Sequence, residues 1–228
     1  MTSRMVEVRR HVLKKNDVAA SALRRRFQQA GVFVVSLVSS PGAGKTAMLE
    51  QTLRALSPGG RVAALVGDLA TDRDAQRLRT SGAPVRQITT GTVCHLDADM
   101  IDSALSDWDL AKLDFLFIEN VGNLVCPASY DLGEHLRAVL FSVTEGEDKP
   151  LKYPTIFNTA DVAVITKSDL AGVVEFDRTS ALRHVAEVRP GLEVLEVSAR
   201  TGAGMPTWLT RLRDARQAAA CASAPSNT

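Results

Sequence analysis

Ser-Ser-Pro-Gly-Ala-Gly-Lys-Thr, residues 39–46, decides the fold of this chain. The stretch follows an apolar β-like segment, Phe33–Val38, and leads into a helical pattern that begins at Lys45. Between a strand and a helix, a loop of small residues lets consecutive backbone N–H groups surround a phosphate, while a Lys reaches the terminal phosphates and a Ser/Thr hydroxyl binds Mg²⁺. Although Ser39 replaces the usual first Gly, we predict a nucleoside triphosphate site made by Gly42, Ala43, Gly44, Lys45, Thr46 and Ala47.

The composition is that of an ordinary globular protein. The chain has 228 residues, of which 45% are hydrophobic and 23% are charged, enough for one sizeable α/β domain. The net charge of +1 gives no reason to expect nucleic acid or a membrane surface as a partner. No apolar run approaches the roughly 20 residues that a membrane span needs. Three cysteines without an export signal favour free thiols in a reducing compartment, so we expect a cytoplasmic protein.

Strand-like and helical patterns alternate along the rest of the chain. The strand-like segments are Phe33–Val38, Val62–Asp68, Pro84–Thr89, Phe115–Val121, Ala160–Thr166 and Leu192–Ser198, with a further apolar stretch at Ala138–Thr144. The helical patterns are Lys45–Leu56, Asp72–Ser81, Leu96–Leu105, Asp177–Val188 and Pro206–Ala219. This alternation predicts an α/β fold of the P-loop NTPase type: a doubly wound, mostly parallel sheet with helices on both faces and ligands at the carboxyl ends of the strands.

The two ends of the chain differ from this alternating region. Residues 1–32 read as one or two amphipathic helices without the apolar core of a secretory signal, and we interpret them as an N-terminal helical extension. Residues 33–219 form the predicted nucleotide-binding domain. Residues 220–228 are small and polar and are expected to be a flexible tail.

A second motif indicates which base the site reads. Thr166-Lys167-Ser168-Asp169 follows a strand-like segment, as the guanine-reading segment of GTPases does. The Asp169 carboxylate can accept from guanine N1–H and the 2-amino group, a donor pair that adenine lacks, and the Lys167 stem can pack along the ring. Farther on, Ser198 and Ala199 resemble the loop that lies behind the guanine. GTP is therefore favoured over ATP.

Carboxylates at the ends of two other strand-like segments are candidates for holding magnesium. Glu119 lies near the end of the segment Phe115–Val121, which is followed by Gly122, whose N–H could meet the γ-phosphate. Asp68 ends the segment Val62–Asp68, and Asp74 follows six residues later. Either of them could be the second carboxylate that holds Mg²⁺. No Gln or Arg stands out as the residue that orients the attacking water, so slow intrinsic hydrolysis is expected.

Cys94, His95 and Cys126 form a third group of interest. Thiolate and imidazole suit Zn²⁺ or Ni²⁺, whereas Mg²⁺ prefers oxygen. Adjacent residues such as Cys94 and His95 can share an ion only in a loop or at a helix start, which is where the pattern places them. Three donors are one short of a four-coordinate site, so water or a residue of a second protomer would supply the fourth ligand. From the residues alone, a structural role remains open: Cys126 as a small buried residue and His95 at a helix start.

Five stretches together resemble the HypB-type hydrogenase nickel-incorporation GTPases, which belong to the SIMIBI class. They are SSPGAGKT at 39–46, GDLATDRDA at 67–75, TGTVCHLD at 90–97, FIENVGNLVCPASYD at 117–131 and SVTEGEDKPLKYP at 142–154. The likeness runs from Val34 to Leu209, and Ser39 is that family's own form of the loop. The resemblance implies a GTP-promoted homodimer that helps to deliver Ni²⁺ to the large subunit precursor of [NiFe] hydrogenase, together with a small zinc-containing nickel chaperone.

The resemblance also implies roles for individual residues. Lys45, Asp74 and Glu119 would be catalytic, and Mg²⁺ would be held by Thr46 and Glu119 with Asp74 or Asp68. Cys94, His95 and Cys126 match the family's Ni²⁺ or Zn²⁺ site near the dimer interface. Residues 145–153 look like the family's mobile loop, whose Lys149 or Lys152 would reach the nucleotide across the dimer. Movement of the Glu119–Gly122 loop on hydrolysis would shift Cys126 and change the affinity for the metal.

Two alternatives and one departure from the family pattern accompany this interpretation. Many relatives carry an N-terminal Cys-rich or His-rich metal motif, whereas residues 1–32 contain no Cys and a single His, His11. The related urease-accessory GTPases carry Cys-Pro-His where this chain has Cys126-Pro127-Ala128. The other alternative is a GTP-gated scaffold that carries no metal itself.

Overall fold

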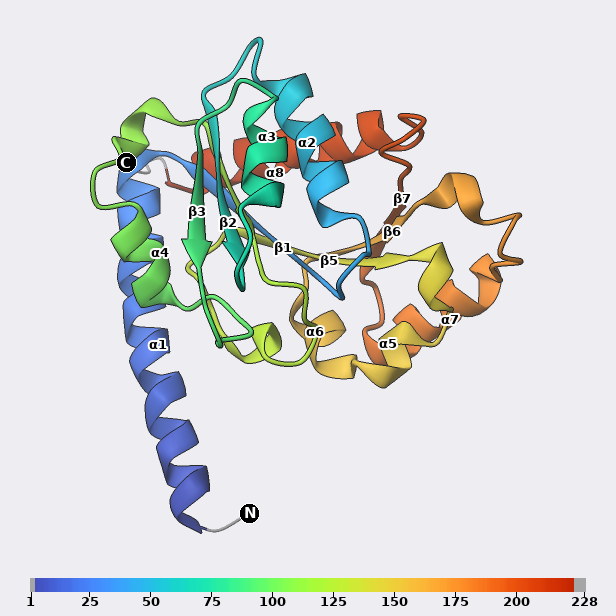
Figure 1. The fold of residues 1–228 in the computed structure, drawn as a ribbon, viewed down its shortest axis with the longest axis horizontal. Coiled ribbons are helices and arrows are strands. Elements are labelled where there is room, and N and C mark those ends of the chain that lie inside the picture. The colour runs from blue at the N-terminus through green and yellow to red at the C-terminus, as the bar shows by residue number, and fades with distance from the viewer. Residues whose placement is uncertain (1–2, 224–228) are drawn as a thin grey trace.

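A single parallel sheet organises the chain. The computed structural model describes residues 3–223, and within them seven strands pair in the order β3-β2-β4-β1-β5-β6-β7 (Figure 1). The strands are β1 Phe33–Ser39, β2 Val62–Asp68, β3 Val85–Thr89, β4 Phe115–Glu119, β5 Leu136–Ser142, β6 Val162–Thr166 and β7 Glu193–Glu196. All six neighbouring pairs are parallel. The predicted doubly wound fold is confirmed, and the additional apolar stretch proves to be the central strand β5.

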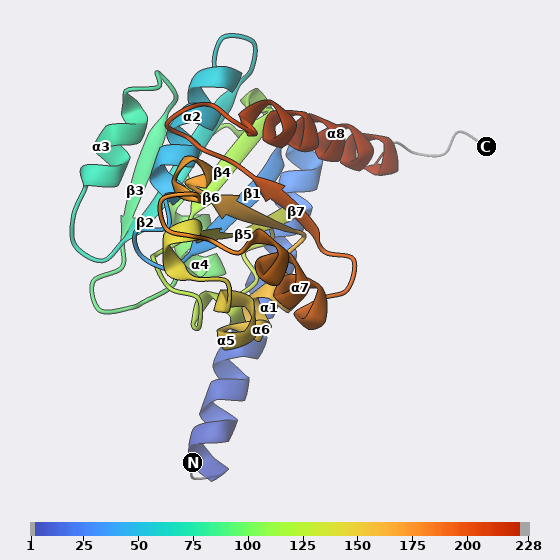
Figure 2. The same cartoon turned by 90° about the vertical axis from the view of Figure 1, so that its right-hand side faces the viewer.

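Helices cover both faces of the sheet (Figures 1 and 2). The helices are α1 Ser3–Ala30, α2 Lys45–Leu56, α3 Arg73–Arg79, α4 Ala98–Ala104, α5 Lys149–Lys152, α6 Pro154–Thr159, α7 Arg178–Val188 and α8 Met205–Ser223. Side chains alternate between the two faces of a strand. On β1, Val35 and Leu37 therefore pack under α2, α3 and α8, whereas Val34 packs under α1 and α4 and Val38 under α6 and α7. A strand buried on both faces reads as a continuous apolar run, as Phe33–Val38 does.

The strand order brings the predicted motifs to one edge of the sheet. In a parallel sheet all carboxyl ends meet at the same edge, and ligands bind where the strand order reverses. Here β1 lies between β4 and β5. The loops that follow β1, β2, β4 and β6, which contain the phosphate-loop, aspartate, glutamate and guanine motifs, consequently open at one side of the molecule.

The N-terminal helix is more closely joined to the domain than the sequence predicts. Helix α1 is one continuous helix, whose first half projects away from the sheet (Figures 1 and 2). Its second half packs into the core through Ala20, Leu23 and Phe27. Gly133 lies so close that a Cβ there would be 2.8 Å from the Ala20 carbonyl oxygen. The second half of α1 therefore packs against the same core as the sheet.

Two further segments differ from expectation. Residues 145–153, expected as a loop, contain α5 and the end of a 3-10 helix, Val143–Glu145, that a reciprocal Ser142–Glu145 capping box begins. Helix α8 continues to Ser223, so residues 220–223 are helical where a tail was expected, and residues 224–228 lie outside the described part of the chain. Among residues 3–223, no helix is both long enough and apolar enough to span a membrane.

Trp208 anchors α8 to the sheet, and its removal tests this packing. Its side chain is fully buried, and its indole N–H donates to Thr52 Oγ1 of α2 at 3.0 Å. We expect Trp208→Ala to lower the free energy of unfolding by about 3–5 kcal/mol, because the substitution leaves a large cavity. Urea unfolding followed by circular dichroism measures this change. Val173→Ala, at a side chain that is 80% exposed, is the control and should stay within about 0.5 kcal/mol of wild type. A loss below about 1 kcal/mol for Trp208→Ala would contradict this description of the core.

Candidate nucleotide and metal site

The loop between β1 and α2 has the backbone shape of a phosphate cradle. Gly42 and Gly44 have positive φ angles of 76° and 94°, a conformation that side chains with a Cβ rarely adopt. Lys45 opens α2, is 8% exposed and donates from Nζ to Ser39 Oγ at 3.0 Å. Burial lowers the pKa of Lys45, while the nearby Glu119 and Asp74 carboxylates oppose this effect. The hydroxyl of Ser39 thus holds the Lys45 ammonium at the loop.

Glu119 and Thr46 form a ready set of oxygen donors. Thr46 Oγ1 donates to Glu119 Oε1 at 2.6 Å, whereas the buried Oε2 atom has no hydrogen-bond partner in the protein. Burial raises the pKa of Glu119 to about 7, although Lys45 and the Thr46 hydrogen bond lower it. A hydroxyl beside a carboxylate with one unused oxygen is chemistry that fits Mg²⁺. These two residues therefore fit the predicted magnesium site.

A cavity of about 540 Å³ joins the loop to these carboxylates. Ten of the predicted residues line it: Gly42, Gly44, Lys45, Thr46, Ala47, Asp68, Asp74, Glu119, Gly122 and Lys167. Asp68 also serves its own loop, because its Oδ1 accepts from the N–H groups of Ala70 and Thr71 at 2.9 and 2.7 Å. Ala43 is buried beneath the loop, and its carbonyl accepts from the Thr166 hydroxyl.

Arg77 also lines this cavity and was missed in the sequence. Its guanidinium pairs with Glu50 of α2 at 2.6 Å. Arg77 lies three residues after Asp74 on α3, and residues three apart share a helix face. That spacing was the available signal, but the sequence does not show which face of α3 meets the cavity.

A second, smaller cavity of about 190 Å³ lies beside the first. Ala47, Lys167, Asp169 and Ala199 line it, and Lys167 lines both cavities. Lys167 has a φ of 56°, in the left-handed region, which costs conformational energy for a residue with a Cβ. Asp169 Oδ1 accepts from the buried Ser198 hydroxyl at 2.6 Å, so Ser198 orients Asp169 and does not itself line the cavity.

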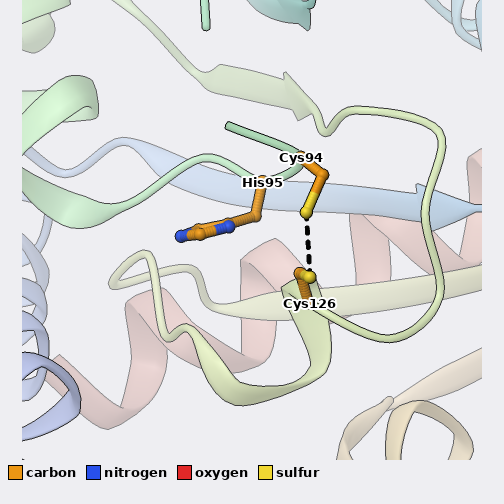
Figure 3. Close-up of side chains that lie close together, drawn as sticks. All are labelled: Cys94, His95 and Cys126. Atoms are coloured by element: carbon orange, nitrogen blue, oxygen red, sulfur yellow. Dashed lines mark hydrogen bonds between the residues drawn. The ribbon is translucent and has the colours of Figure 1, made fainter. Parts of the chain in front are cut away.

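Cys94, His95 and Cys126 converge on one point (Figure 3). Cys94 and His95 lie in the loop between β3 and α4, and Cys126 lies just before the 3-10 helix Pro127–Ser129. Their candidate ligand atoms all lie within 4.8 Å of one another, and the two sulfur atoms are 2.9 Å apart. Because the Cys94–His95 backbone is neither strand nor helix, two adjacent side chains can serve one ion.

The imidazole of His95 is prepared to act as a ligand. Its Nδ1 is buried without a hydrogen-bond partner in the protein, and its ring stacks on Tyr130 with the centroids 3.8 Å apart. Burial lowers the pKa of His95, although Asp97 opposes this effect, and a neutral imidazole is the form that binds metal. A soft donor set with an unsatisfied ring nitrogen fits Ni²⁺ or Zn²⁺ and not Mg²⁺.

The two lysines predicted to act across a dimer do not line either cavity. Lys149 Nζ lies 3.1 Å from Glu145 Oε1 and 5.2 Å from the centroid of the Tyr153 ring. Glu145 also accepts from the Ser40 hydroxyl of the phosphate loop. Lys152 pairs with Asp148 at 2.6 Å in an exposed position. Within one chain, neither lysine is brought to the nucleotide cavity.

Comparison with known proteins agrees with this geometry. Residues 33–196 match the family model "CobW/HypB/UreG, nucleotide-binding domain". Hydrogenase maturation factor HypB of Azotobacter vinelandii is 48% identical over 207 residues, which are 91% of this chain and 68% of that protein.

Two solved structures extend the comparison to three dimensions. The structure of HypB from Helicobacter pylori in complex with nickel is similar with a TM-score of 0.84 and 41% identity, covering 90% of this chain and 96% of that one. For Archaeoglobus fulgidus HypB the TM-score is 0.83 with 36% identity, covering 89% and 99%. The resemblance predicted from the five motifs is thereby confirmed. The chain belongs to the CobW/HypB/UreG family and, within it, to the HypB hydrogenase maturation factors.

Proposed function

We propose that this protein is a GTP-hydrolysing metallochaperone that helps to insert nickel into the large subunit of [NiFe] hydrogenase. One observation carries the proposal: a convergent Cys-His-Cys group includes Cys126, whose loop continues directly from Val121 and Gly122 of the nucleotide cavity. A GTPase that only signals has no use for such a group. A metal carrier needs both a site for the cargo and a switch that changes its affinity.

The nucleotide would occupy both cavities. The phosphates fit the larger cavity, where backbone N–H groups and Lys45 meet them, and the guanine fits the smaller one against Asp169. Thr46 and Glu119, with Asp74 or Asp68 nearby, would hold Mg²⁺, which neutralises charge that develops on the phosphates. Lys45, Asp74 and Glu119 are our candidates for the catalytic group. We propose that the protein hydrolyses GTP and that its intrinsic rate of hydrolysis is slow.

The nickel ion is cargo in this proposal. Cys94, His95 and Cys126 supply three donors, and a second protomer or water would supply the next. Zn²⁺ competes for thiolates, so the same site would also bind Zn²⁺. The relatives named hydrogenase maturation factor HypB are more similar to this chain than those named hydrogenase/urease maturation factor HypB, at 48% against 43% identity, which favours hydrogenase. This chain also has Ala128 where the urease-accessory family has the His of its Cys-Pro-His motif.

Assembly and partners are inferred from the same family. We propose a cytoplasmic homodimer that GTP promotes, in which Lys149 or Lys152 leaves its present carboxylate partner, Glu145 or Asp148, and meets the nucleotide of the second protomer. A small zinc-containing nickel chaperone and the hydrogenase large subunit precursor would be the proteins that give and receive the metal. No feature of charge or motif indicates nucleic acid or a membrane as a further partner.

Asp169 provides a test of guanine recognition. Asp169→Asn should weaken GTP binding by about 100-fold or more, because an amide N–H then faces the guanine donors. The same amide should improve binding of xanthosine triphosphate, whose 2-position carries an acceptor. Competition against a fluorescent guanine nucleotide measures both affinities. Asp109→Asn, at an exposed aspartate outside both cavities, is the matched control. Unchanged GTP affinity in Asp169→Asn would refute this assignment.

The raised pKa of Glu119 predicts an unusual dependence of folding stability on pH. Its folded pKa of about 7 lies above the ordinary value of 4.5, so the folded state binds the proton more tightly than the unfolded state does. In nucleotide-free protein the resulting stabilisation is complete below pH 4.5 and is lost as pH rises through 7, a change of roughly 3 kcal/mol. Glu119→Gln should remove this component.

Urea unfolding gives the free energy of unfolding of wild type and of Glu119→Gln at pH 5 and at pH 8. The change between the two pH values in wild type, minus the same change in Glu119→Gln, is the contribution of Glu119. Glu187→Gln, at an exposed glutamate on α7, is the control and should follow wild type. An identical pH dependence in wild type and Glu119→Gln would contradict this prediction, because Glu119 would then have an ordinary pKa in the folded protein.

The thiols provide the test of the proposed cargo site. Nickel titration, followed by calorimetry and by thiolate-to-nickel absorption, should give a site that Cys94→Ala/Cys126→Ala weakens by about 100-fold or more. Cys221→Ala removes the exposed thiol on α8 and is the matched control. If the double variant binds nickel as wild type does, the protein carries no metal at this site. The GTP-gated scaffold then becomes the better proposal.

A further inference from the structure

One side-chain amide joins the two loops that carry the thiols. Asn123 Nδ2 donates to the Cys94 carbonyl oxygen at 3.2 Å, and Asn123 Oδ1 accepts from the Val125 N–H at 2.9 Å. Val125 directly precedes Cys126. A displacement of Asn123 would therefore act on the backbone beside both sulfur atoms at once.

The residue before Asn123 touches the phosphate loop. Gly122 lines the nucleotide cavity, and a Cβ at this position would lie 3.0–3.1 Å from atoms of Pro41. Such a close approach explains why a glycine stands here. A γ-phosphate that attracts the Gly122 N–H would move this peptide, and Asn123 is covalently attached to it.

The side-chain amide of Asn120 holds the backbone next to His95, the third member of the Cys-His-Cys group. The Asn120 side chain is buried, and its Oδ1 accepts from the N–H groups of Leu96 and Val121 at 3.1 and 2.9 Å. The Leu96 side chain packs so closely on Gly67 that a Cβ there would meet it at 2.8–2.9 Å. His95 is thus anchored to the ends of β2 and β4 through its neighbour Leu96. With His95 held, a movement of Asn123 changes the positions of the sulfur atoms relative to the imidazole.

We infer that Asn123 is a positioning residue that transmits the state of the nucleotide to the Cys94–His95–Cys126 group. This inference rests on the proposed function and adds the residue that couples its two sites. When Gly122 moves toward or away from a γ-phosphate, the two hydrogen bonds of Asn123 pull on the backbones of Cys94 and Val125. The spacing of the thiols changes, and with it the affinity for Ni²⁺. Coupling between two sites of one protein is typically about 5- to 150-fold in affinity.

The test compares nickel affinities in two nucleotide states. Ni²⁺ is titrated into the full chain with Mg²⁺ and either GDP or a non-hydrolysable GTP analogue, and thiolate-to-nickel absorption reports binding. The measured quantity is the ratio of the two dissociation constants. Asn123→Ala removes both hydrogen bonds, whereas Asn123→Asp keeps the acceptor for Val125 and loses the donor to Cys94. Asn158→Ala, at an exposed asparagine on α6, is the matched control.

We expect wild type and Asn158→Ala to share a ratio well away from one, and Asn123→Ala to bring the ratio to within about twofold of one. Asn123→Asp should also reduce the ratio and serves as the second variant if the alanine variant does not fold. Affinity for the GTP analogue and the thermal midpoint should stay near wild type in the variants that are compared.

A wild-type ratio in both folded Asn123 variants would overturn this inference and leave the proposed function intact. Loss of nickel binding in both nucleotide states would also overturn it, because Asn123 would then shape the site without transmitting a signal. A ratio of one in wild type would refute the nucleotide-dependent coupling itself, and this inference with it.

Discussion

The parallel pairing of β1 with β4 is the constraint on which the whole site depends. Leu37 lies opposite Glu119 in this pair, and the Asn120 N–H continues the ladder by donating to the Leu37 carbonyl at 3.0 Å. The register places Glu119 within 2.6 Å of the Thr46 hydroxyl. It also starts the loop to Cys126 directly beside the phosphate loop. One set of backbone hydrogen bonds thus sets both the positions of the candidate magnesium donors and the distance between the nucleotide cavity and Cys126.

The site contains two buried charged groups, Lys45 and Glu119, that the surrounding protein stabilises poorly. Burial shifts the pKa of Lys45 down and that of Glu119 up, so each group is driven toward its neutral form although the two attract each other. Glu119 Oε2 and His95 Nδ1 are both buried without a hydrogen-bond partner in the protein. A buried polar atom without a partner costs stability, and a cation at either position would recover that cost. This arrangement favours the binding of cations at the cost of folding stability.

Helix α1 contacts the segments that follow the loops of Cys94, His95 and Cys126. Asn16 donates to the Asp131 carbonyl at 2.9 Å and accepts from the Ala98 N–H at 2.9 Å. Arg24 pairs with the Asp131 carboxylate at 2.7 Å. Because Ala98 begins α4 and Asp131 follows the 3-10 helix after Cys126, α1 contacts the segments downstream of both thiol loops. Helix α1 is thus hydrogen-bonded to the segments that follow both loops of the Cys-His-Cys group.

By itself, the sequence determined the fold class, the family and the position of the phosphate loop, and it located the candidate guanine motif and the candidate magnesium carboxylates. Each of these is local: a few consecutive residues between a strand and a helix carry the chemistry, and their spacing shows in the chain. Only the tertiary structure showed how closely the predicted partners Cys94 and Cys126 meet, and it alone decided that Asn123 joins their loops, that Arg77 lines the cavity and that α1 packs into the core. These contacts join residues far apart in sequence or depend on which helix face meets the sheet. The order β2-β4-β1 and the packing of helices on it bring them together, and no local pattern records that order.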